Sequence, residues 1–379
     1  MWAKAGVSSG FAGGEGLPSS PMRKAERIGG YDLELRAPRA SGDILVEWRA
    51  LEQRAVEPNL FAGPDFLAAA TTHLNAFRDL KVLLVWRGRR LEGAIPLTSA
   101  SIGFTSREVR TPQVEYGCSG APLLDAGNAE GVLAAACTWL ASRHASIVFE
   151  GLAEDGPFRA LLHGFAERTG RGVLRLDQAS HAAETTPLFN LAPVATLPAD
   201  SAANIDRALD PVAIRAAVED YLLLEAQDAL AHGRPALIQQ PGQANVVRTV
   251  TRQLGRSKQC QVFTLRLGGR VAASAIILLE PGLARVWKFT ADPQLRGYPV
   301  EELLKKRVER LLTRRVSVGA LVGRNENAAS SASYRMALKP GAKPESIARR
   351  LGERVRKSAD TLAITANRRL ASIRRKPAA

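Results

Sequence analysis

Two passages of the same design occur in this chain, and this repeat constrains the fold more than any other feature of the sequence. Each passage is a β-rich run, a short turn that contains Gly and Arg, and a second β-rich run. The passages cover residues 81–97 and 261–279. Apolar runs separated by a Gly-containing turn are typical of β-hairpins. The sequence therefore predicts two hairpins, one in each half of the chain.

The elements expected around the two hairpins follow the same order. An amphipathic helix precedes each hairpin, and a strand, a loop, a second helix and a final strand follow it. These helices and strands cover 64–74, 107–112, 128–142 and 145–151 in the first passage, and 244–254, 284–290, 301–314 and 316–322 in the second. Chance is the alternative explanation, because hairpins with Gly turns are common. The shared order of six elements predicts instead an α/β (α+β) protein with two duplicated domains, each a mixed sheet flanked by helices.

The repeat divides the chain into five expected segments. They are a disordered arm (1–30), an N-terminal domain (31–198), a helical connector (199–235), a C-terminal domain (236–342) and a basic amphipathic helical tail (343–379). Gly, Ser and Pro dominate the arm, which has no apolar core of the kind a secretory signal needs. In the connector, Asp210 before Pro211 predicts the N-cap and first residue of a helix.

The positive charge of the chain is confined to its C-terminal part. Residues 296–379 contain 21 Lys and Arg against 7 Asp and Glu, which is +14 of the total of +15. In the tail, apolar residues recur at helical spacing and basic residues fill most other positions. One interpretation is a solvated cationic face on a helix that packs against the body of the protein. The other is contact with an anionic membrane or polymer. Sequence-specific nucleic-acid binding is not expected, because no aromatic residues alternate with the charges.

Several classes of site and location are not expected from the sequence. The chain has three Cys, and this odd number excludes a disulfide framework that pairs them all. Cys118, Cys137 and Cys260 are far apart and form no CxxC pair, and no His, Asp or Glu group has metal-ligand spacing, so we expect no metal. The longest apolar run, near 271–279, is about half of what a membrane span needs. We therefore expect a cytoplasmic protein, with peripheral membrane contact through the tail as the alternative.

The junction between strand and helix in the second passage predicts a phosphate-binding loop. A helix N-terminus offers free N–H groups and a positive dipole end. Here a basic residue and a glycine directly precede the helix, and the expected cofactor-binding residues are Arg296, Gly297, Tyr298, Pro299 and Val300. The alternative is an ordinary turn. The equivalent loop of the first passage has no basic residue and contains Asp125, so the second domain is the expected cofactor domain.

This order of elements resembles the core of the GNAT acyltransferases, which hold the pyrophosphate of acetyl-CoA on such a loop. Specific strings resemble the double-domain GNAT-like family associated with cellulose biosynthesis and related to FemAB-type transferases. They are Trp48-Arg-Ala-Leu51, Pro58-Asn59-Leu-Phe61, Tyr221-Leu-Leu-Leu-Glu225, the hairpin 265–279, Trp287-Lys288 and Asp292. The resemblance covers about residues 40–315. It implies an acyl-CoA-dependent N- or O-acyltransferase with acetyl-CoA as cosubstrate and a sugar, polysaccharide precursor or other envelope-related acceptor.

Four residues are candidates for catalysis in such a transfer, which needs alignment of the substrates and a proton acceptor. Glu225 matches the central-helix Glu of the family and would orient the acceptor or the base; an exposed helix Glu is the alternative. Lys288 interrupts an apolar strand, and alternation places it opposite Trp287 and Phe289. Asp292 would act in the site or form an Asx-Pro turn. Tyr334 would protonate the leaving thiolate, unless it is an ordinary core or surface Tyr.

Departures from the family pattern leave other functions open. Ala226-Gln227-Asp228 follows the central Glu where the family has Trp-Lys-Gly, and Val300 replaces a Gly at the helix start. These changes fall near the expected acceptor site. One alternative is therefore a catalytically inactive GNAT-like scaffold that binds an anionic membrane or polymer. Another is FemAB-type aminoacyl transfer from tRNA.

Overall fold

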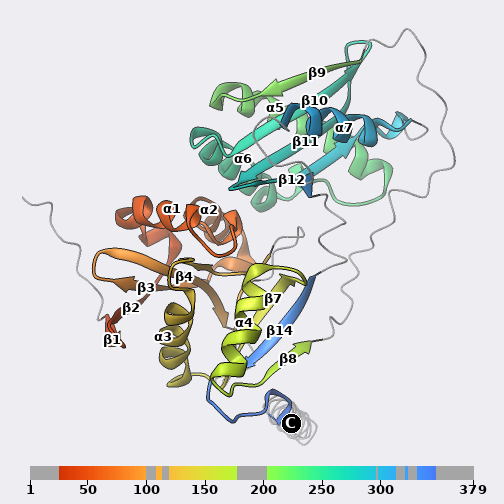
Figure 1. Cartoon of the computed structure of the whole chain (residues 1–379). Coiled ribbons are helices and arrows are strands. Elements are labelled where there is room, and N and C mark those ends of the chain that lie inside the picture. The colour runs from red at the N-terminus through yellow and green to blue at the C-terminus, as the bar shows by residue number, and fades with distance from the viewer. Residues whose placement is uncertain are drawn as a thin grey trace, which may run out of the picture.

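The computed structural model describes residues 25–99, 108–112, 119–176, 203–295, 298–312, 321–322 and 331–346. These residues form two sheets flanked by helices, so the fold is mixed α/β, as the sequence predicts. One sheet belongs mainly to the N-terminal half and the other to the C-terminal half (Figure 1). The N-terminal arm up to residue 24 and the tail from residue 347 lie outside the described residues.

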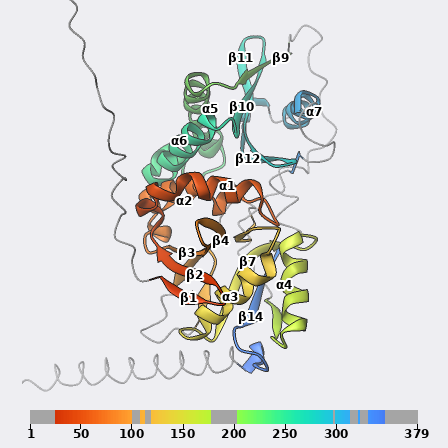
Figure 2. The ribbon, with the colours of Figure 1, turned by 60° about the vertical axis from the view of Figure 1, so that its left-hand side comes forward.

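The N-terminal sheet has nine strands within the described part of the chain, in the order β1-β2-β3-β4-β5-β7-β14-β8, with β6 paired to β4. The strands are β1 (Glu26–Ile28), β2 (Tyr31–Arg36), β3 (Lys81–Arg87), β4 (Arg90–Ser99), β5 (Glu108–Arg110), β6 (Leu123–Leu124), β7 (Ser146–Ala153), β8 (Val173–Leu176) and β14 (Ser331–Ala337). The helices α1 (Leu45–Gln53) and α2 (Pro64–His73) pack on one face. The helices α3 (Ala129–Ala141) and α4 (Pro157–Arg168) pack on the other (Figure 2).

The C-terminal sheet has the order β13-β12-β11-β10-β9. Its strands are β9 (Ala203–Ala208), β10 (Cys260–Leu267), β11 (Arg270–Glu280), β12 (Leu283–Ala291) and β13 (Leu321–Val322). The helices α5 (Pro211–Ala231) and α6 (Pro241–Arg256) cover one face. The helix α7 (Val300–Leu312) covers the other, because its buried residues Val300, Leu304, Val308 and Leu312 recur every four positions.

The two halves agree residue by residue in their hairpins. The paired positions are Val85–Gly93 and Arg87–Arg90 in the first hairpin, and Leu265–Ala273 and Leu267–Arg270 in the second. Each position is displaced by 180 residues, and the β-bulge falls at the same step in both hairpins. A bulge is a specific local feature of a strand pair, so its shared position supports the duplication.

The strand after the hairpin is continuous in the C-terminal half and interrupted in the N-terminal half. Arg110 of β5 pairs with Thr98 as Arg285 of β12 pairs with Leu278, and Leu123 of β6 pairs with Ala94 as Thr290 pairs with Ser274. β5 and β6 together therefore correspond to β12. Residues 111–122 connect β5 to β6, whereas only residues 286–289 separate the corresponding positions of β12.

The strand β14 crosses from one half of the molecule to the other. The boundaries expected from the sequence include residues 331–337 in the C-terminal domain. In the structure, β14 lies between β7 and β8 in the N-terminal sheet and is antiparallel to both (Figure 1). The N-terminal fold is therefore completed by a segment that follows the C-terminal sheet in sequence.

Residues expected to form a helical connector belong to the C-terminal sheet and its helices. β9 pairs with β10, and α5 packs on the same sheet. The helix begins as predicted, because the Asp210 carboxylate accepts hydrogen bonds from the backbone N of Val212 and Ala213, and Pro211 is the first helical residue.

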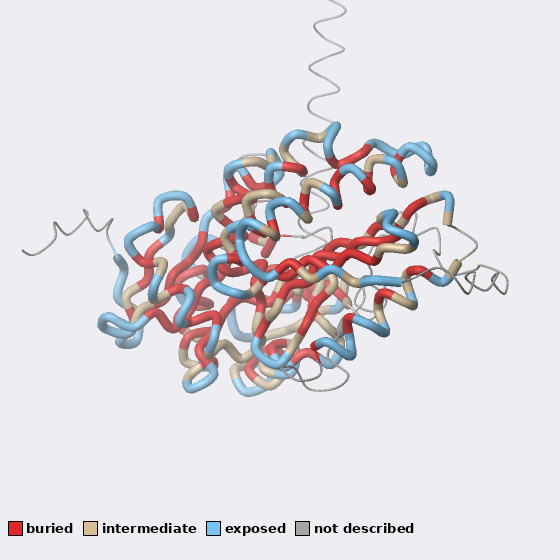
Figure 3. Tube along the Cα trace, turned by 90° about the horizontal axis from the view of Figure 1, so that it is seen from above, coloured by how far each residue is buried: buried red, intermediate tan, exposed pale blue. Residues whose placement is uncertain are grey.

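A single hydrophobic core joins the two halves. Trp48 of α1 and Phe61 pack in one cluster with Val246 of α6 and Trp287 of β12, and the rings of Phe61 and Trp287 are 6.5 Å apart. α1 and α2 lie between the two sheets (Figure 2), and the buried residues concentrate in the strands (Figure 3). The strings at 48–51 and 58–61 that carry the family resemblance therefore build the junction between the halves.

Candidate functional site

The candidate site lies along β12, where a bulge interrupts the pairing with β11. Ile276 pairs with Lys288 and Ile277 with Val286, so Trp287 is the extra residue. Trp287 and Ile276 belong to the core under α5 and α6, whereas Val286 and Phe289 pack towards α7. Lys288, which lies directly opposite Ile276, therefore shares a side with Trp287. The alternation expected from the sequence is wrong at this point because the bulge adds one residue.

Lys288 is a buried cation on the α5-facing side of the sheet. Only 3% of the residue is exposed, and its Nζ lies 5.7 Å from the centroid of the Trp287 ring. An ammonium group costs free energy to bury, so its retention inside an apolar strand points to a functional or an ionic role. The side chain makes further interactions in the structure, so it is not an isolated charge.

Beyond the first residues of β12, its outer edge has no paired strand among the described residues. β13 pairs with Ala284 and Arg285 alone, in parallel, while β12 continues to Ala291. From the bulge towards α7, no described strand pairs with the backbone of this edge, and an unpaired strand edge is a surface to which an extended ligand can add.

Asp292 shapes the turn that leaves β12. Its Oδ1 accepts a hydrogen bond from the backbone N of Gln294 at 2.9 Å, which is the Asx turn considered from the sequence. Its Oδ2 lies 2.7 Å from Nη2 of Arg270. Both carboxylate oxygens are thus engaged in holding the loop.

The described part of the expected phosphate loop leads directly into α7. The backbone N of Tyr298 donates to the Leu295 carbonyl, and the Pro299 carbonyl accepts from the N of Leu303 as the helix begins. Glu301 and Glu302 lie in the first turn and oppose an anion there, although Glu302 is paired with Lys306. Arg296 and Gly297, the basic residue and glycine of the predicted loop, lie outside the described residues.

Glu225 is buried on α5 and holds the segment that follows this helix. Its two carboxylate oxygens accept hydrogen bonds from Nη1 of Arg234 at 2.7 Å and from the backbone N of Leu237 at 2.8 Å. Only 3% of the residue is exposed, so the alternative of an exposed helix Glu is wrong.

Tyr334 lies on β14, in the N-terminal sheet, and so on a different sheet from Lys288 and Asp292. It is buried in the core beneath α4, where its ring packs edge-on against His163 at 5.4 Å. The structure therefore brings Lys288, Asp292 and the start of α7 together on one sheet and places Tyr334 elsewhere.

In the N-terminal half, ion pairs join the strands beside the interruption between β5 and β6. Arg110 donates to Glu150 at 2.9 Å and to Glu108 at 2.7 Å, and Arg335 of β14 donates to Glu108 at 2.6 Å. These groups tie β5, β7 and β14 together. Nearby charges from Arg335 and Arg110 hold the pKa of Glu108 below its ordinary value despite burial. Arg110 corresponds to Arg285 of β12, which pairs with Glu280 in the other copy. Both copies therefore hold an ion pair at this position, and within the described residues the network is larger in the N-terminal copy.

No local pattern in the sequence indicates the group of carboxylates that lies at the junction of the halves. Glu280 at the end of β11 accepts a hydrogen bond from the backbone N of Leu60 at 2.9 Å and pairs with Arg285 at 3.2 Å. Glu52 of α1 accepts from Nε2 of Gln259 at 2.8 Å. Burial raises the pKa of Glu52 to about 7.

Other chemistry has little support within the described residues. Burial raises the pKa of the Cys137 and Cys260 thiols to about 12, so neither is an activated nucleophile; Cys118 lies outside the described residues. No group of three or more His, Cys, Asp or Glu side chains there is arranged to hold a metal ion. None of the described helices has the length and apolar composition that a membrane span requires.

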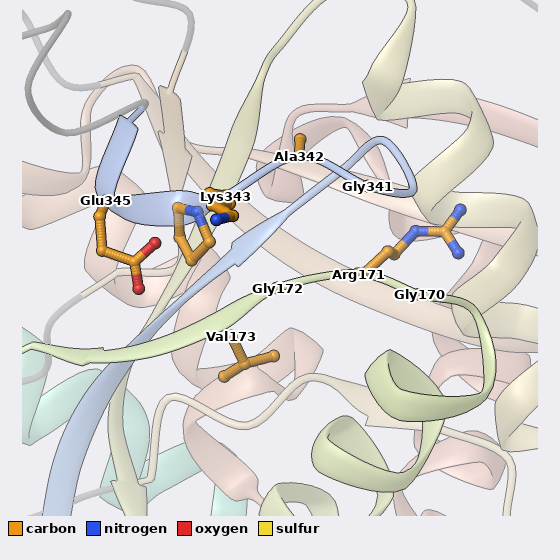
Figure 4. A pocket seen from close by; sticks show the side chains of 9 residues that line it. Gly170, Arg171, Gly172, Val173, Gly341, Ala342, Lys343 and Glu345 are labelled. Carbon is orange, nitrogen blue, oxygen red and sulfur yellow. The ribbon is translucent and has the colours of Figure 1, made fainter.

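A surface depression lies away from β12, between two turns of the N-terminal half. The turn between α4 and β8 supplies Arg171, and the turn after β14 supplies Lys343 and Glu345 (Figure 4). The two turns are joined by a hydrogen bond from the N of Gly341 to the carbonyl of Gly170. None of the candidate catalytic residues lines this depression.

Residues 197–321 match the family model described as "Acetyltransferase (GNAT) domain". This match covers β9 to β13, so the open strand β12 and the helix α7 lie within it. This part of the chain is therefore similar to a GNAT acetyltransferase domain. No curated protein matches the sequence.

Several solved structures are similar to most of the chain at low sequence identity. A tandem GNAT protein from the clavulanic acid biosynthesis pathway is 16% identical, with a TM-score of 0.38, and the match covers 82% of this chain and 100% of that one. FemX is 8% identical, with a TM-score of 0.47 and coverages of 72% and 85%. L-PGS from Bacillus licheniformis is 8% identical, with a TM-score of 0.46 and coverages of 82% and 95%.

Proposed function

We propose that the protein is a cytoplasmic acyl-CoA-dependent N- or O-acyltransferase, with acetyl-CoA as the first candidate cosubstrate, and that only its C-terminal half binds the cosubstrate. The observation that supports this most strongly is the difference between the two copies. The C-terminal copy has a bulged strand with an open edge that leads to the N-terminus of α7. At the corresponding positions the N-terminal copy has an interrupted strand, because residues 111–122 separate β5 from β6.

The extended part of the cosubstrate would lie along the open edge of β12, with its phosphates at the start of α7. Arg296, Gly297, Tyr298, Pro299 and Val300 are the residues proposed to receive the phosphates. Backbone N–H groups at a helix N-terminus and one Arg suit phosphate oxygens. The acyl group would then lie near the bulge, close to Lys288.

The reaction itself needs few protein groups. The acceptor amine or hydroxyl attacks the acyl carbon, its proton passes to a base, and the CoA thiolate leaves. Lys288 is proposed to stabilise the developing negative charge on the acyl oxygen. Asp292 and Glu225 are proposed to act by holding the loop and α5 in place, because their carboxylate oxygens are already engaged. A proton donor role for Tyr334 would require a path from the other sheet.

The acceptor is proposed to be a sugar, a polysaccharide precursor or another envelope-related amine or hydroxyl. An inactive scaffold that binds an anionic membrane or polymer through residues 343–379 is the alternative from another class. Aminoacyl transfer of the FemAB type is the third proposal.

Calorimetry with acetyl-CoA tests the enzyme proposal. We expect binding by the full chain, weaker binding by Arg296→Glu, and unchanged binding by Arg252→Glu, which makes the same charge change at an exposed position of α6. If the full chain releases no heat at high acetyl-CoA concentration, the acyl-CoA proposal is wrong and the scaffold proposal is favoured.

A further inference from the structure

The ion pair between Arg270 and Asp292 has no part in the proposed chemistry, yet it fixes the turn that leaves β12. Arg270 is the first residue of β11, directly after the hairpin turn. Its Nη2 lies 2.7 Å from Oδ2 of Asp292 and donates to Oε1 of Gln294 at 2.9 Å. One guanidinium group therefore holds two residues of the loop between β12 and α7.

The backbone of Asp292 is hydrogen-bonded to β11 and to the loop that follows, so the ion pair is linked to both. Its N donates to the carbonyl of Ala272 at 2.8 Å, and its carbonyl accepts from the N of Leu295 at 2.9 Å. The side chain is 2% exposed, and Oδ2 has no hydrogen-bond partner other than its ionic contact with Arg270. Loss of the guanidinium would leave a buried carboxylate oxygen unpaired, so the turn would have to move to hydrate it.

We call the ion pair between Arg270 and Asp292 the Arg–Asp clamp. The N-terminal half contains the same clamp at the corresponding positions. Arg90 begins β4, and its Nη2 lies 2.5 Å from Oδ2 of Asp125, which precedes α3. Asp125 likewise accepts from the backbone N two residues later, that of Gly127, at 3.0 Å. Asp125 has a second arginine, Arg54, at 2.7 Å. The clamp thus belongs to the duplicated fold, and in the C-terminal half it depends on Arg270.

We propose that Arg270 is a positioning residue for the cosubstrate: it fixes the direction in which the loop leaves β12, and thereby the place where α7 presents its N-terminus to the phosphates. This inference rests on the proposed function. Arg270 contacts Asp292 and Gln294 rather than the open edge of β12, so it acts through them. A displaced loop would weaken phosphate binding without unfolding the domain.

The test compares matched variants of the two clamps. Calorimetry with CoA is carried out on the full chain, Arg270→Gln and Arg90→Gln, with thermal unfolding recorded for each. Both variants lose one positive charge at the start of equivalent strands. We expect Arg270→Gln to raise the Kd for CoA about tenfold. We expect Arg90→Gln to change it by less than about twofold.

Each outcome bears on a different claim. An unchanged Kd in Arg270→Gln, or an equal rise in both variants, overturns the positioning role. No CoA binding by the unaltered chain overturns the proposed function, and the positioning role with it.

Two further variants complete the test. Arg270→Lys keeps a cation for Asp292 and should recover most of the affinity for CoA; if it binds as weakly as Arg270→Gln, the clamp is not what positions the loop. If Arg270→Gln fails to fold, Gln294→Met, at an exposed position, should still raise the Kd about threefold, and an unchanged Kd there overturns the inference.

Discussion

Lys288 is the side chain on which the proposed chemistry depends most directly. It lies at the bulge of β12, beside Trp287, with 3% of the residue exposed. We expect Lys288→Met, which keeps most of the aliphatic volume, to lower the rate of acyl transfer about 100-fold. The Kd for CoA should remain nearly unchanged, because the phosphates would bind at α7. Release of free CoA thiol with an acceptor that supports turnover measures the rate, and calorimetry measures the Kd.

The same substitution at an exposed lysine provides the control. Lys81→Met removes an exposed cation at the start of β3, in the other half of the chain, and should leave both quantities close to those of the unaltered protein. Equal rates in the Lys288 and Lys81 variants would remove Lys288 from the proposed mechanism.

Glu52 predicts a pH dependence of stability. Arg49 pairs with Asp65 and Arg285 with Glu280, whereas Glu52 accepts a hydrogen bond from the neutral amide of Gln259. Its pKa is raised to about 7 in the folded protein, so the folded state prefers the protonated form. This contribution is present in full below the ordinary pKa of Glu and is lost as the pH rises through about 7.

We therefore expect Glu52→Gln to raise the free energy of unfolding at pH 8 by up to roughly 3 kcal/mol. The free energy of unfolding of this variant should also depend less on pH between roughly pH 5 and pH 8. The gain at pH 5 should be small. Urea unfolding at several pH values measures the free energy, with Glu47→Gln on the same helix as the control. If the free energy of unfolding depends on pH in the same way in both variants, the pKa of Glu52 is not raised in the folded protein.

At the scale of the element, the sequence predicts the helices and hairpins whose form depends on residues close to one another in the chain. The hairpins, α2, α3 and α7, and the Asp210 cap follow from alternation, helical spacing and turn residues within a few positions. The short strand β9 was missed, because Ala203–Ala208 is mostly exposed and has little alternation of apolar and polar residues. The bulge at Trp287 was missed because its position depends on the pairing with β11.

For the candidate site, the sequence alone also indicates single residues within one strand but not residues that meet across strands. Lys288 and Asp292 are unusual residues in or after an apolar strand, so the sequence alone indicates them. Tyr334 could not be placed, because β14 pairs with β7 and β8 across a sequence separation that no local pattern encodes. The carboxylates Glu52, Asp65 and Glu280 come from three separate segments and meet only in the folded chain.

The strand β14 makes the N-terminal sheet dependent on the end of the described chain. It lies between β7 and β8, so its removal leaves β8 without its partner and exposes one edge of β7. We expect a chain that ends at residue 346 to unfold cooperatively, and a chain that ends at residue 322 to lose the near-UV circular dichroism of a packed core. If the shorter chain unfolds within about 3 °C of the longer one, β14 is not required for the N-terminal fold.

At the scale of the whole molecule, the two duplicated copies share features of their fold and differ at the strand that follows the hairpin. Both keep the hairpin register, its bulge and the Arg–Asp clamp. The C-terminal copy keeps an uninterrupted β12, whereas the N-terminal copy has a longer excursion and a charged network between its strands. The N-terminal copy also supplies α1 and α2 to the core that the halves share. We infer that it supports the C-terminal copy through this shared core.

Hydrogen exchange with and without acetyl-CoA tests the central claim most directly, because it locates the cosubstrate in one copy. We predict protection in peptides that cover β12 and the start of α7, and no change in peptides that cover β6 and α3, the corresponding part of the other copy. Protection of β6 and α3 with none at β12 and α7 would contradict the account.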